Sequence, residues 1–301
     1  IAKKLGVSRQ LVTFALSGYS QISKKSRQRI LEAAREMGYR PNFYARALKK
    51  GRSGIIGLWV PDQISTHYTQ VARELNRLVK AARHELIVSE VSIAEEQQML
   101  SHVPMDGIFV VDAPEQVKVY RKSFTTSKVP IISMGADCVE NTDSVQVDLL
   151  AGTSEVMAHL INSGFRRIAH ATFVRENSFR ASRRLGYVKA MQAAKLKPEF
   201  IYYPLTEQQR PIVRQLIQDY IREHGCPDAI FCHSDDVALG IYRGLSDMKL
   251  RVPDDVALVG CDGIQDTEYL ECPLTTLVQP VAAMCATAWQ FLMRRINRGH
   301  M

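Results

Sequence analysis

The sequence lacks most of the patterns that mark a membrane protein or an enzyme. It has no run of 18 apolar residues, which excludes a membrane-spanning helix. No G-x-G-x-x-G follows a strand-like run, and neither a P-loop nor a G-x-S-x-G motif occurs. The sequence therefore gives no support to a dinucleotide site, a P-loop phosphate site or a hydrolase nucleophile of the G-x-S-x-G type.

Cysteine is scarce, and its spacing indicates no metal or redox motif. The six cysteines form no C-x-x-C pair and no signal peptide is visible, so we expect reduced, mostly buried thiols in a cytoplasmic protein. Because the chain begins at Ile1, we expect further residues before it. Its 301 residues, 46% of them hydrophobic, are enough for two or three domains with their own cores.

Excess positive charge is absent from most of the chain and concentrated at one end. Residues 1–54 hold 13 Lys and Arg but only two acidic residues, a net charge of +11, whereas residues 55–301 have a net charge of −3. Phosphate neutralisation dominates affinity for nucleic acids, so this asymmetry predicts a polyanionic partner for the first segment alone. The alternative is a solvated basic tail, but the segment has the apolar periodicity of helices.

The start of the basic segment predicts a helix-turn-helix. Ala2, Gly6 and Val12 have its spacing: a small residue where two helices touch, a glycine at the turn and an apolar anchor beyond it. Ser8 is placed to cap the second helix, which buries Leu11, Val12, Ala15 and Leu16 and exposes Arg9, Gln10, Thr13 and Phe14.

A third helix and a short hinge complete this segment. Ser23 is placed to cap a helix over 24–37, with Met37 among its inward residues and Gly38 at its end. Residues 43–49 predict a helix too brief to be stable in isolation, and 50–54 predict a linker.

The remaining 247 residues alternate between strand-like and helix-like patterns. Buried parallel strands separated by helices indicate a doubly wound α/β fold. The expected strands are 55–60, 86–91, 107–111, 130–134, 167–171, 229–232 and 256–261. The expected helices are 69–83, 152–163, 179–194, 207–223 and 236–248.

Seven motifs are spread along almost the whole chain: GVSRQLVTFALSG, ISKKSRQRILEAAREMGYRPNFYARAL, IIGLWVPD, RRLGY, AIFCHSDDVALG, RVPDDVALVGCDG and PLTTLVQP. In this order and spacing they resemble the lactose/galactose repressor family of bacterial transcription regulators. The resemblance implies an all-α helix-turn-helix domain at 1–40, a hinge and linker at 41–54, and a two-lobed, periplasmic-binding-protein-like core at 55–301. Lobe one would contain about 55–148 and 280–301, and lobe two about 149–279.

The resemblance also implies roles in DNA binding. Arg9 and Gln10 match positions that enter the major groove, where Arg suits guanine and Gln suits adenine. Phe14 stands where the family usually has Arg, so it either touches a thymine methyl or packs. Phosphate contacts are implied for Ser8, Thr13, Ser23, Ser26, Tyr39 and Asn42. A minor-groove hinge is implied for Ala45, Arg46, Leu48 and Lys49, with Leu48 as the wedge between base steps.

A second set of positions matches the family's effector site between the lobes. Arg183 and Asp262 match the family's ligand-holding arginine and aspartate, and Asp235 keeps the aspartate of the usual Asn-Asp pair. Two departures leave the ligand open: Ser234 replaces the asparagine, and Ser65-Thr66-His67-Tyr68 replaces Asn-Pro-Phe-Phe, although His67 and Tyr68 are still expected to line the cleft.

We therefore predict a dimeric repressor that binds a near-palindromic DNA operator and a sugar-like effector, with no cofactor and no enzyme activity. His233, Asp235 and Asp236 offer too few convergent groups for a metal, and the two aspartates predict instead an acidic start of the helix over 236–248. Two alternatives stay open: a regulator with a degenerate cleft, controlled by a partner protein, and a sugar-binding transport protein. The basic helical segment argues against the second.

Overall fold

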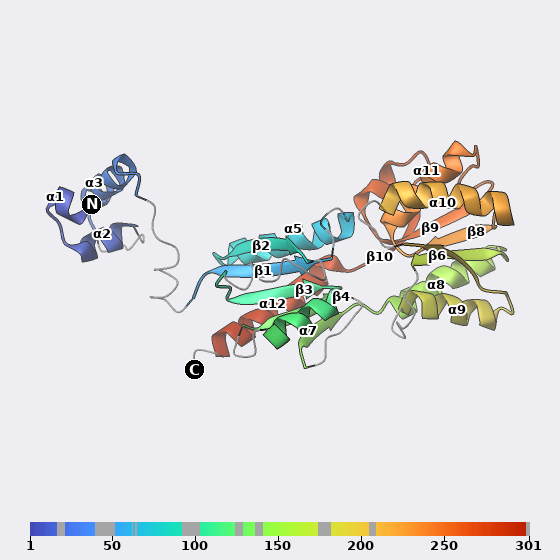
Figure 1. The fold of residues 1–301 in the computed structure, drawn as a ribbon, viewed down its shortest axis with the longest axis horizontal. Coiled ribbons are helices and arrows are strands. Elements are labelled where there is room, and N and C mark those ends of the chain that lie inside the picture. Colours follow the sequence, from blue (N-terminus) through green and yellow to red (C-terminus); the bar gives the residue numbers. More distant parts are fainter. Residues whose placement is uncertain are drawn as a thin grey trace. The chain divides into compact units, whose positions relative to one another are not determined.

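The computed structural model describes residues 1–16, 22–39, 52–61, 63, 65–91, 103–123, 129–135, 141–173, 182–204 and 209–298. The chain divides into two compact units, Ile1–Ser53 and Gly54–Met301. Figure 1 shows a small helical unit and a larger unit of helices and strands.

The N-terminal unit contains three described helices around a small core. They are α1 (Ala2–Leu5), α2 (Arg9–Leu16) and α3 (Lys24–Glu36). Gly6 ends α1 in the left-handed conformation, with a φ of 65°, as expected for the turn of a helix-turn-helix. Val12, Ala15, Ile22 and Ile30 form the buried cluster.

Side-chain caps begin two of these helices where the sequence predicts them. The Leu11 amide donates to Ser8 Oγ at 3.1 Å, and the Ser26 amide donates to Ser23 Oγ at 3.2 Å. The prediction that Met37 points inward is wrong, since this residue is 49% exposed. The cause is the end of α3 at Glu36, which places Met37 beyond the last turn.

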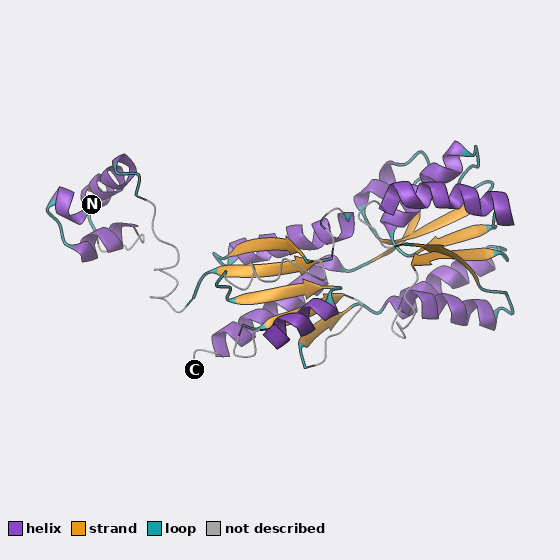
Figure 2. Cartoon of the chain, viewed as in Figure 1, coloured by secondary structure: helices purple, strands orange, loops and turns teal. Residues whose placement is uncertain are grey.

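The larger unit contains two parallel five-stranded sheets, drawn as orange arrows in Figure 2. The first has the order β2-β1-β3-β4-β5 and the second β10-β9-β8-β6-β7. We call the first sheet with its helices lobe one and the second lobe two. The strands are β1 (Ile55–Val60), β2 (Glu85–Glu90), β3 (Gly107–Val111), β4 (Ile131–Gly135), β5 (Asp143–Gln146), β6 (Ile168–Phe173), β7 (Glu199–Tyr203), β8 (Ala229–Cys232), β9 (Ala257–Asp262) and β10 (Thr275–Val278).

Helices cover both faces of the lobe-two sheet. Alternate residues of β8 show this: Ile230 and Cys232 pack with side chains of α10 and α11, whereas Ala229 and Phe231 pack with side chains of α8 and α9. Lobe one contains α5 (Thr66–Ala81), α7 (Pro114–Ser123) and α12 (Val281–Arg298). Lobe two contains α8 (Leu149–Asn162), α9 (Ser182–Ala193), α10 (Gln209–His224), α11 (Asp235–Asp247) and the 3-10 turn η1 (Gln265–Tyr269).

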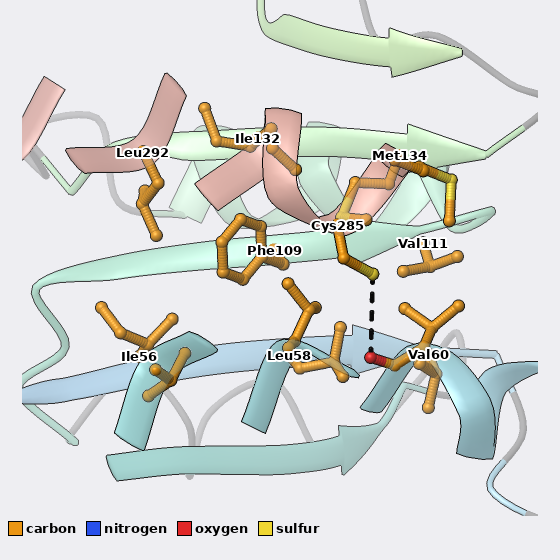
Figure 3. Close-up of a cluster of buried hydrophobic side chains, with 14 of the residues drawn as sticks. Ile56, Leu58, Val60, Phe109, Val111, Ile132, Met134, Cys285 and Leu292 are labelled. Atoms are coloured by element: carbon orange, nitrogen blue, oxygen red, sulfur yellow. Dashed lines mark hydrogen bonds between the residues drawn. The ribbon is translucent and has the colours of Figure 1, made fainter. Parts of the chain in front are cut away.

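The hydrophobic core of lobe one is built from segments far apart in the sequence, from β1 and β3 to α12. Leu58 on β1, Phe109 on β3 and Leu292 on α12 are fully buried in one cluster (Figure 3). The helix α12 thus returns the chain to the first sheet, where α5 packs beside it. Each large apolar side chain in this cluster contributes about 1.5–3 kcal/mol through its removal from water.

The α/β class and its doubly wound character are confirmed. All seven expected strands are present, with bounds shifted by at most two residues. Three further strands, β5, β7 and β10, and the helices α7 and α12 were not expected. All three of these strands lie at sheet edges and are partly exposed, and β5 and β10 also lack the continuous apolar run on which the other strand predictions depended.

Candidate functional site

The exposed face of α2 presents polar side chains that the sequence assigns to DNA contact. Arg9, Gln10 and Thr13 are exposed, while Val12 and Ala15 on the opposite face are buried. The Thr13 hydroxyl donates to the Arg9 carbonyl at 3.0 Å, which holds Thr13 against its own helix. Arg9 and Gln10 are therefore free to reach a partner from the first turn of α2.

Phe14 does not belong to this exposed face. It is partly buried and packs against the cluster around Val12, Ala15 and Ile30. Of the two expectations for this residue, contact with a thymine methyl or packing, the structure favours packing. The face of α2 that is open to a partner therefore presents polar side chains only.

Of the described residues expected at phosphates, Thr13 lies in the middle of α2 and the others lie at or near the ends of helices. Ser8 and Ser23 precede α2 and α3, and Ser23 Oγ donates to Ser26 Oγ at 2.9 Å. Tyr39 follows α3 and shares with Arg9 and Met37 a shallow hollow of about 230 Å³. The start of a helix also favours phosphate, because the helix dipole is positive at that end. Asn42, Ala45, Arg46, Leu48 and Lys49 lie outside the described residues.

A second group of polar residues, four of them buried and two half-buried, lies where the two lobes meet. We call it the interlobe cluster: His67 and Asp112 from lobe one, and Arg183, Asp235, Asp262 and Gln279 near the ends of lobe-two elements. Parallel topology explains the meeting, since Asp262 ends β9 and Asp112 directly follows β3.

Asp262 is the carboxylate of the cluster whose pKa is shifted most from its ordinary value. It is 5% exposed and adopts a φ of 127°, an unusual conformation for a residue with a side chain. Gln279 Nε2 donates to Asp262 Oδ1 at 2.7 Å, and Arg183 Nη1 lies 3.8 Å from the same oxygen. Burial raises the pKa of Asp262 to about 6, although the charges of His67 and Arg183 act to lower it.

Arg183 is the cation of the cluster. Its Nη1 donates to the His233 carbonyl at 2.8 Å and contacts Cys261 Sγ at 3.5 Å, and the side chain is 13% exposed. Burial acts to lower the pKa of Arg183, but Cys261, Asp262 and Asp112 raise it above its ordinary value. Because Asp112 belongs to lobe one, this attraction crosses between the lobes.

Lobe one contributes two aromatic side chains from the start of α5. His67 is 6% exposed, and its Nδ1 atom is buried without a hydrogen-bond partner. Tyr68 contacts the His67 ring at 5.5 Å between centroids, and its hydroxyl donates to Asp112 Oδ2 at 3.5 Å. An orphaned buried nitrogen costs about 1–3 kcal/mol, so His67 is a position where a bound hydroxyl would stabilise the site.

Two expected effector residues instead have structural partners. Ser234 Oγ accepts from the Val237 amide at 3.3 Å and caps α11. Asp235 is fully buried and accepts from the Gly263 and Ile264 amides at 2.7 and 2.9 Å, and from Thr276 Oγ1 at 2.6 Å. These bonds fix the chain after β9, so Asp235 positions Asp262.

Two cluster members were not expected from the sequence. Asp112 directly follows the buried strand β3, and Asp262 is the last residue of the buried strand β9. An acidic residue at the carboxyl end of a buried strand is therefore the sequence signal that could have predicted Asp112. Gln279 follows β10, which was itself not predicted. Gly260 also contributes, because a β-carbon there would overlap the Asp235 carboxylate.

Among the described residues, no three His, Cys, Asp or Glu side chains could share a metal ion, and no helix is long and apolar enough to span a membrane. Asp235 and Asp236 occupy the first turn of α11, as the helix-start interpretation predicts.

A separate cavity of about 730 Å³ lies at the opposite edge of the lobe-two sheet, beside the starts of β6 and β7. Its lining includes Arg166, Lys197 and Phe200 as well as Arg167 and Glu199. Arg167 donates to Glu199 through Nε and Nη2 at 3.0 and 2.7 Å, so these two charges neutralise each other.

Comparison with known proteins matches both units to described families. Residues 1–42 match bacterial regulatory proteins of the lacI family, and residues 157–301 match a periplasmic binding protein-like domain. The ribose operon repressor of Haemophilus influenzae is 26% identical over 305 residues, covering 99% of this chain and 91% of that protein.

Two solved structures share the fold. A lac repressor dimer bound to operator and the anti-inducer ONPF has a TM-score of 0.78 and 22% identity, covering 98% of this chain and 91% of that one. A complex of the transcriptional regulator CelR with cellobiose has a TM-score of 0.68 and 23% identity, covering 100% of this chain and 92% of that one. These similar proteins are transcription regulators.

Proposed function

This chain belongs to the lacI family of bacterial regulatory proteins, and from this premise we propose that it is a cytoplasmic, dimeric repressor whose operator affinity is controlled by a sugar-like effector. The observation that carries the DNA-binding part is that the three described helices of the N-terminal unit leave Arg9 and Gln10 exposed at the start of α2, within a segment of net charge +11. Two copies would bind the half-sites of a near-palindrome.

The proposed division of labour on DNA follows from side-chain chemistry. Arg9 donates two hydrogen bonds to guanine, and Gln10 forms a donor–acceptor pair with adenine. The hydroxyls of Ser8, Thr13, Ser23, Ser26 and Tyr39, with Asn42, hold phosphates and set the register. Leu48, with Ala45, Arg46 and Lys49 beside it, enters the minor groove and bends the operator.

The proposed effector site is the interlobe cluster. The Asp262 carboxylate accepts bonds from two adjacent sugar hydroxyls, and Arg183 donates to a ring or hydroxyl oxygen. His67 Nδ1, which has no partner, bonds a further hydroxyl. The cellobiose complex of a similar regulator supports this class of ligand.

Effector and operator are coupled because they favour different arrangements of the same dimer. A ligand bound between the lobes stabilises their closed arrangement, and the shift in the dimer orders or releases the two hinge segments. Whether the ligand weakens or strengthens operator binding depends on which arrangement orders the hinge.

In-vitro selection of the full-length protein against random duplex DNA tests the DNA-binding part. We expect enrichment of a two-fold-symmetric site with half-sites about one helical turn apart and a deformable central step. Arg9→Ala should remove the preference at one base pair of each half-site and leave the rest of the site unchanged. Salt-sensitive binding without any enriched sequence would contradict the proposal.

Calorimetry against a carbohydrate panel tests the effector part. We expect a sugar that binds the wild type and binds Arg183→Gln at least tenfold more weakly. Arg184→Gln is the matched control, because Arg184 lies one residue along α9 over the Phe200 and Tyr202 rings. A silent panel favours the alternative of control by a partner protein, which the capping role of Ser234 also supports.

A further inference from the structure

A second set of contacts joins the lobes outside the interlobe cluster. Asp236, in the first turn of α11, accepts from Ser65 Oγ at 3.1 Å and from the Thr66 amide at 3.3 Å. Ser65 and Thr66 belong to lobe one, at the start of α5. A single lobe-two carboxylate thus bonds a hydroxyl and a backbone amide of the other lobe.

The Asp236 carboxylate acts as the cap that α5 does not supply for itself. Ser65 is the N-cap residue of α5, but its side chain makes no capping bond within its own helix. The first amides of a helix need acceptors, and a negative charge there is favourable because the helix dipole is positive at that end. Moving lobe two away therefore leaves the Thr66 amide without this acceptor.

Arg210 of α10 completes the contact. Its Nε and Nη2 donate to Asp236 Oδ1 at 2.9 and 2.6 Å, and Nη2 also donates to Thr66 Oγ1 at 3.2 Å. Arg210 therefore holds the carboxylate in place and contacts lobe one itself. Charge-assisted bonds of this length are among the stronger polar contacts in proteins.

This set lies nearer to solvent than the interlobe cluster. The Arg210 side chain is 44% exposed, whereas the Arg183 and Asp262 side chains are 13% and 6% exposed. A sugar can reach Asp262 only after the lobes separate, because the carboxylate is enclosed in this structure. Separation breaks the bonds between Asp236 and lobe one.

We propose that Ser65, Thr66, Arg210 and Asp236 form an interlobe latch that biases the ligand-free protein towards the closed arrangement. The proposal rests on the proposed function only in that the effector must pass the latch. It adds that closure does not depend on the effector, so the closed arrangement is already populated before the effector binds. Opening of the latch then limits how fast the effector enters and leaves.

The size of the bias follows from the bonds that opening removes. Hydrogen bonds to a charged group are the strongest of these, and solvent at Arg210 weakens the part it contributes. Loss of the latch should therefore raise the ratio of open to closed protein about tenfold. Such a change is large enough to measure without knowledge of the effector.

Single-molecule energy transfer in the ligand-free, full-length protein tests the latch. One fluorophore replaces Lys80 on α5 and the other replaces Glu223 on α10, two exposed positions in different lobes. Labelled subunits are diluted with unlabelled protein so that each dimer carries one pair. We expect Arg210→Gln, Asp236→Asn and Ser65→Ala each to enlarge the low-transfer, open population.

The chain offers a matched control. Arg214, one turn along α10, donates through Nε to Asp247 of α11 at 2.6 Å and is 47% exposed, yet this pair lies within lobe two. Arg214→Gln removes the same kind of ion pair between the same helices and should leave the energy-transfer distribution unchanged. Circular dichroism checks that all variants keep the wild-type helix content.

Two outcomes overturn the proposal. In the first, Arg210→Gln, Asp236→Asn and Ser65→Ala all give the wild-type distribution. In the second, Arg214→Gln enlarges the open population as much as Arg210→Gln does, which assigns the effect to packing of α10 on α11. Neither outcome depends on DNA or sugar binding, so failure of the latch and failure of the repressor function remain distinguishable.

Discussion

The two units of this protein place the residues proposed to bind DNA and the effector in opposite environments. In the N-terminal unit, Arg9 and Gln10 are exposed and adjacent in sequence. In the larger unit, His67, Arg183 and Asp262 are buried and come from three distant segments. The comparison teaches that a surface for a polyanion is built locally on one helix, whereas a site for a small polar ligand depends on where two sheets end.

Charge separates the units in the same way. The N-terminal segment concentrates a net charge of +11, which attracts phosphate over long distances. The larger unit is nearly balanced, and its important charges are single groups that burial has perturbed, such as Asp262. Long-range attraction therefore belongs to one unit and short-range selectivity to the other.

The largest expected effect on operator binding comes from unfolding the N-terminal unit while the larger unit stays folded. A unit of 53 residues is stabilised by roughly 3–8 kcal/mol, and Ile30→Ala in its core should cost about 2–5 kcal/mol. Ile30 is 1% exposed. We expect operator binding to fall more than a hundredfold while the thermal transition of the larger unit is unchanged, as measured by DNA titration and calorimetry.

The matched change in the larger unit is Leu292→Ala, in the core of lobe one. It should lower the thermal transition of that unit and leave the N-terminal unit folded. If either substitution shifts both transitions equally, the two units unfold together and the comparison fails.

The next effect is a dependence of stability on pH that belongs to the larger unit. The pKa of Asp262 in the folded protein is about 6, above its ordinary value of 3.8, because burial disfavours the charged form. The stabilisation is therefore complete below about pH 4 and is lost as the pH rises through 6, by up to about 3 kcal/mol.

Asp262→Asn removes this titration and suits the positive φ at this position. The melting temperature of the variant should therefore rise relative to wild type between pH 4 and 7. Asp254→Asn, at a side chain 60% exposed, is the control and should keep the wild-type dependence. Parallel melting curves for wild type and Asp262→Asn at every pH would contradict the expectation.

A smaller effect concerns base contact by the N-terminal unit. Arg9→Ala should weaken operator binding by about 1–3 kcal/mol, roughly tenfold to a hundredfold, without changing stability, since the side chain is exposed. Arg35→Ala, an exposed arginine in the last turn of α3, is the control. Electrophoretic titration should show a loss for Arg9→Ala that depends on sequence, and for Arg35→Ala at most a slight, uniform loss.

The smallest effect sharpens the assignment of Phe14. Because Phe14 packs on the helical core, Phe14→Leu should cost about 1 kcal/mol of stability in the N-terminal unit and leave the selected DNA sequence unchanged. Gln10→Ala should do the reverse, with a changed preference and unchanged stability. A new base preference in Phe14→Leu would return this residue to the DNA-contacting face.

Predictions from the sequence were most accurate for features that depend on residues close together in the chain. The caps Ser8 and Ser23, the turn at Gly6 and the exposure of Arg9 all depend on neighbours within a few residues, and the structure agrees with each. Met37 failed because helix ends are decided by small differences between the last turns. The prediction that Phe14 is exposed was wrong, because periodicity cannot tell a side chain at the edge of a core from one beside it.

In the larger unit the sequence could name Arg183 and Asp262 but not what surrounds them. Ser234 and Asp235 have the residue types of a ligand site, yet their hydrogen bonds go to α11 and to the chain after β9. Asp112 and Gln279 were missed because their closeness to Asp262 or Arg183 depends on strand order, and β10 itself lacks an apolar run.

By itself the sequence determined most of the helices, the buried strands and the separation of charge, because these follow from periodicity, capping and composition over short stretches. The tertiary structure alone decided which carboxylates are buried, which serve as caps and which hold the lobes together. Asp235, Asp236 and Asp262 are the same residue type within 28 positions, yet one fixes a loop, one caps a helix of the other lobe and one carries a raised pKa. The physical reason is that the environment of a side chain depends on which distant strands and helices end beside it.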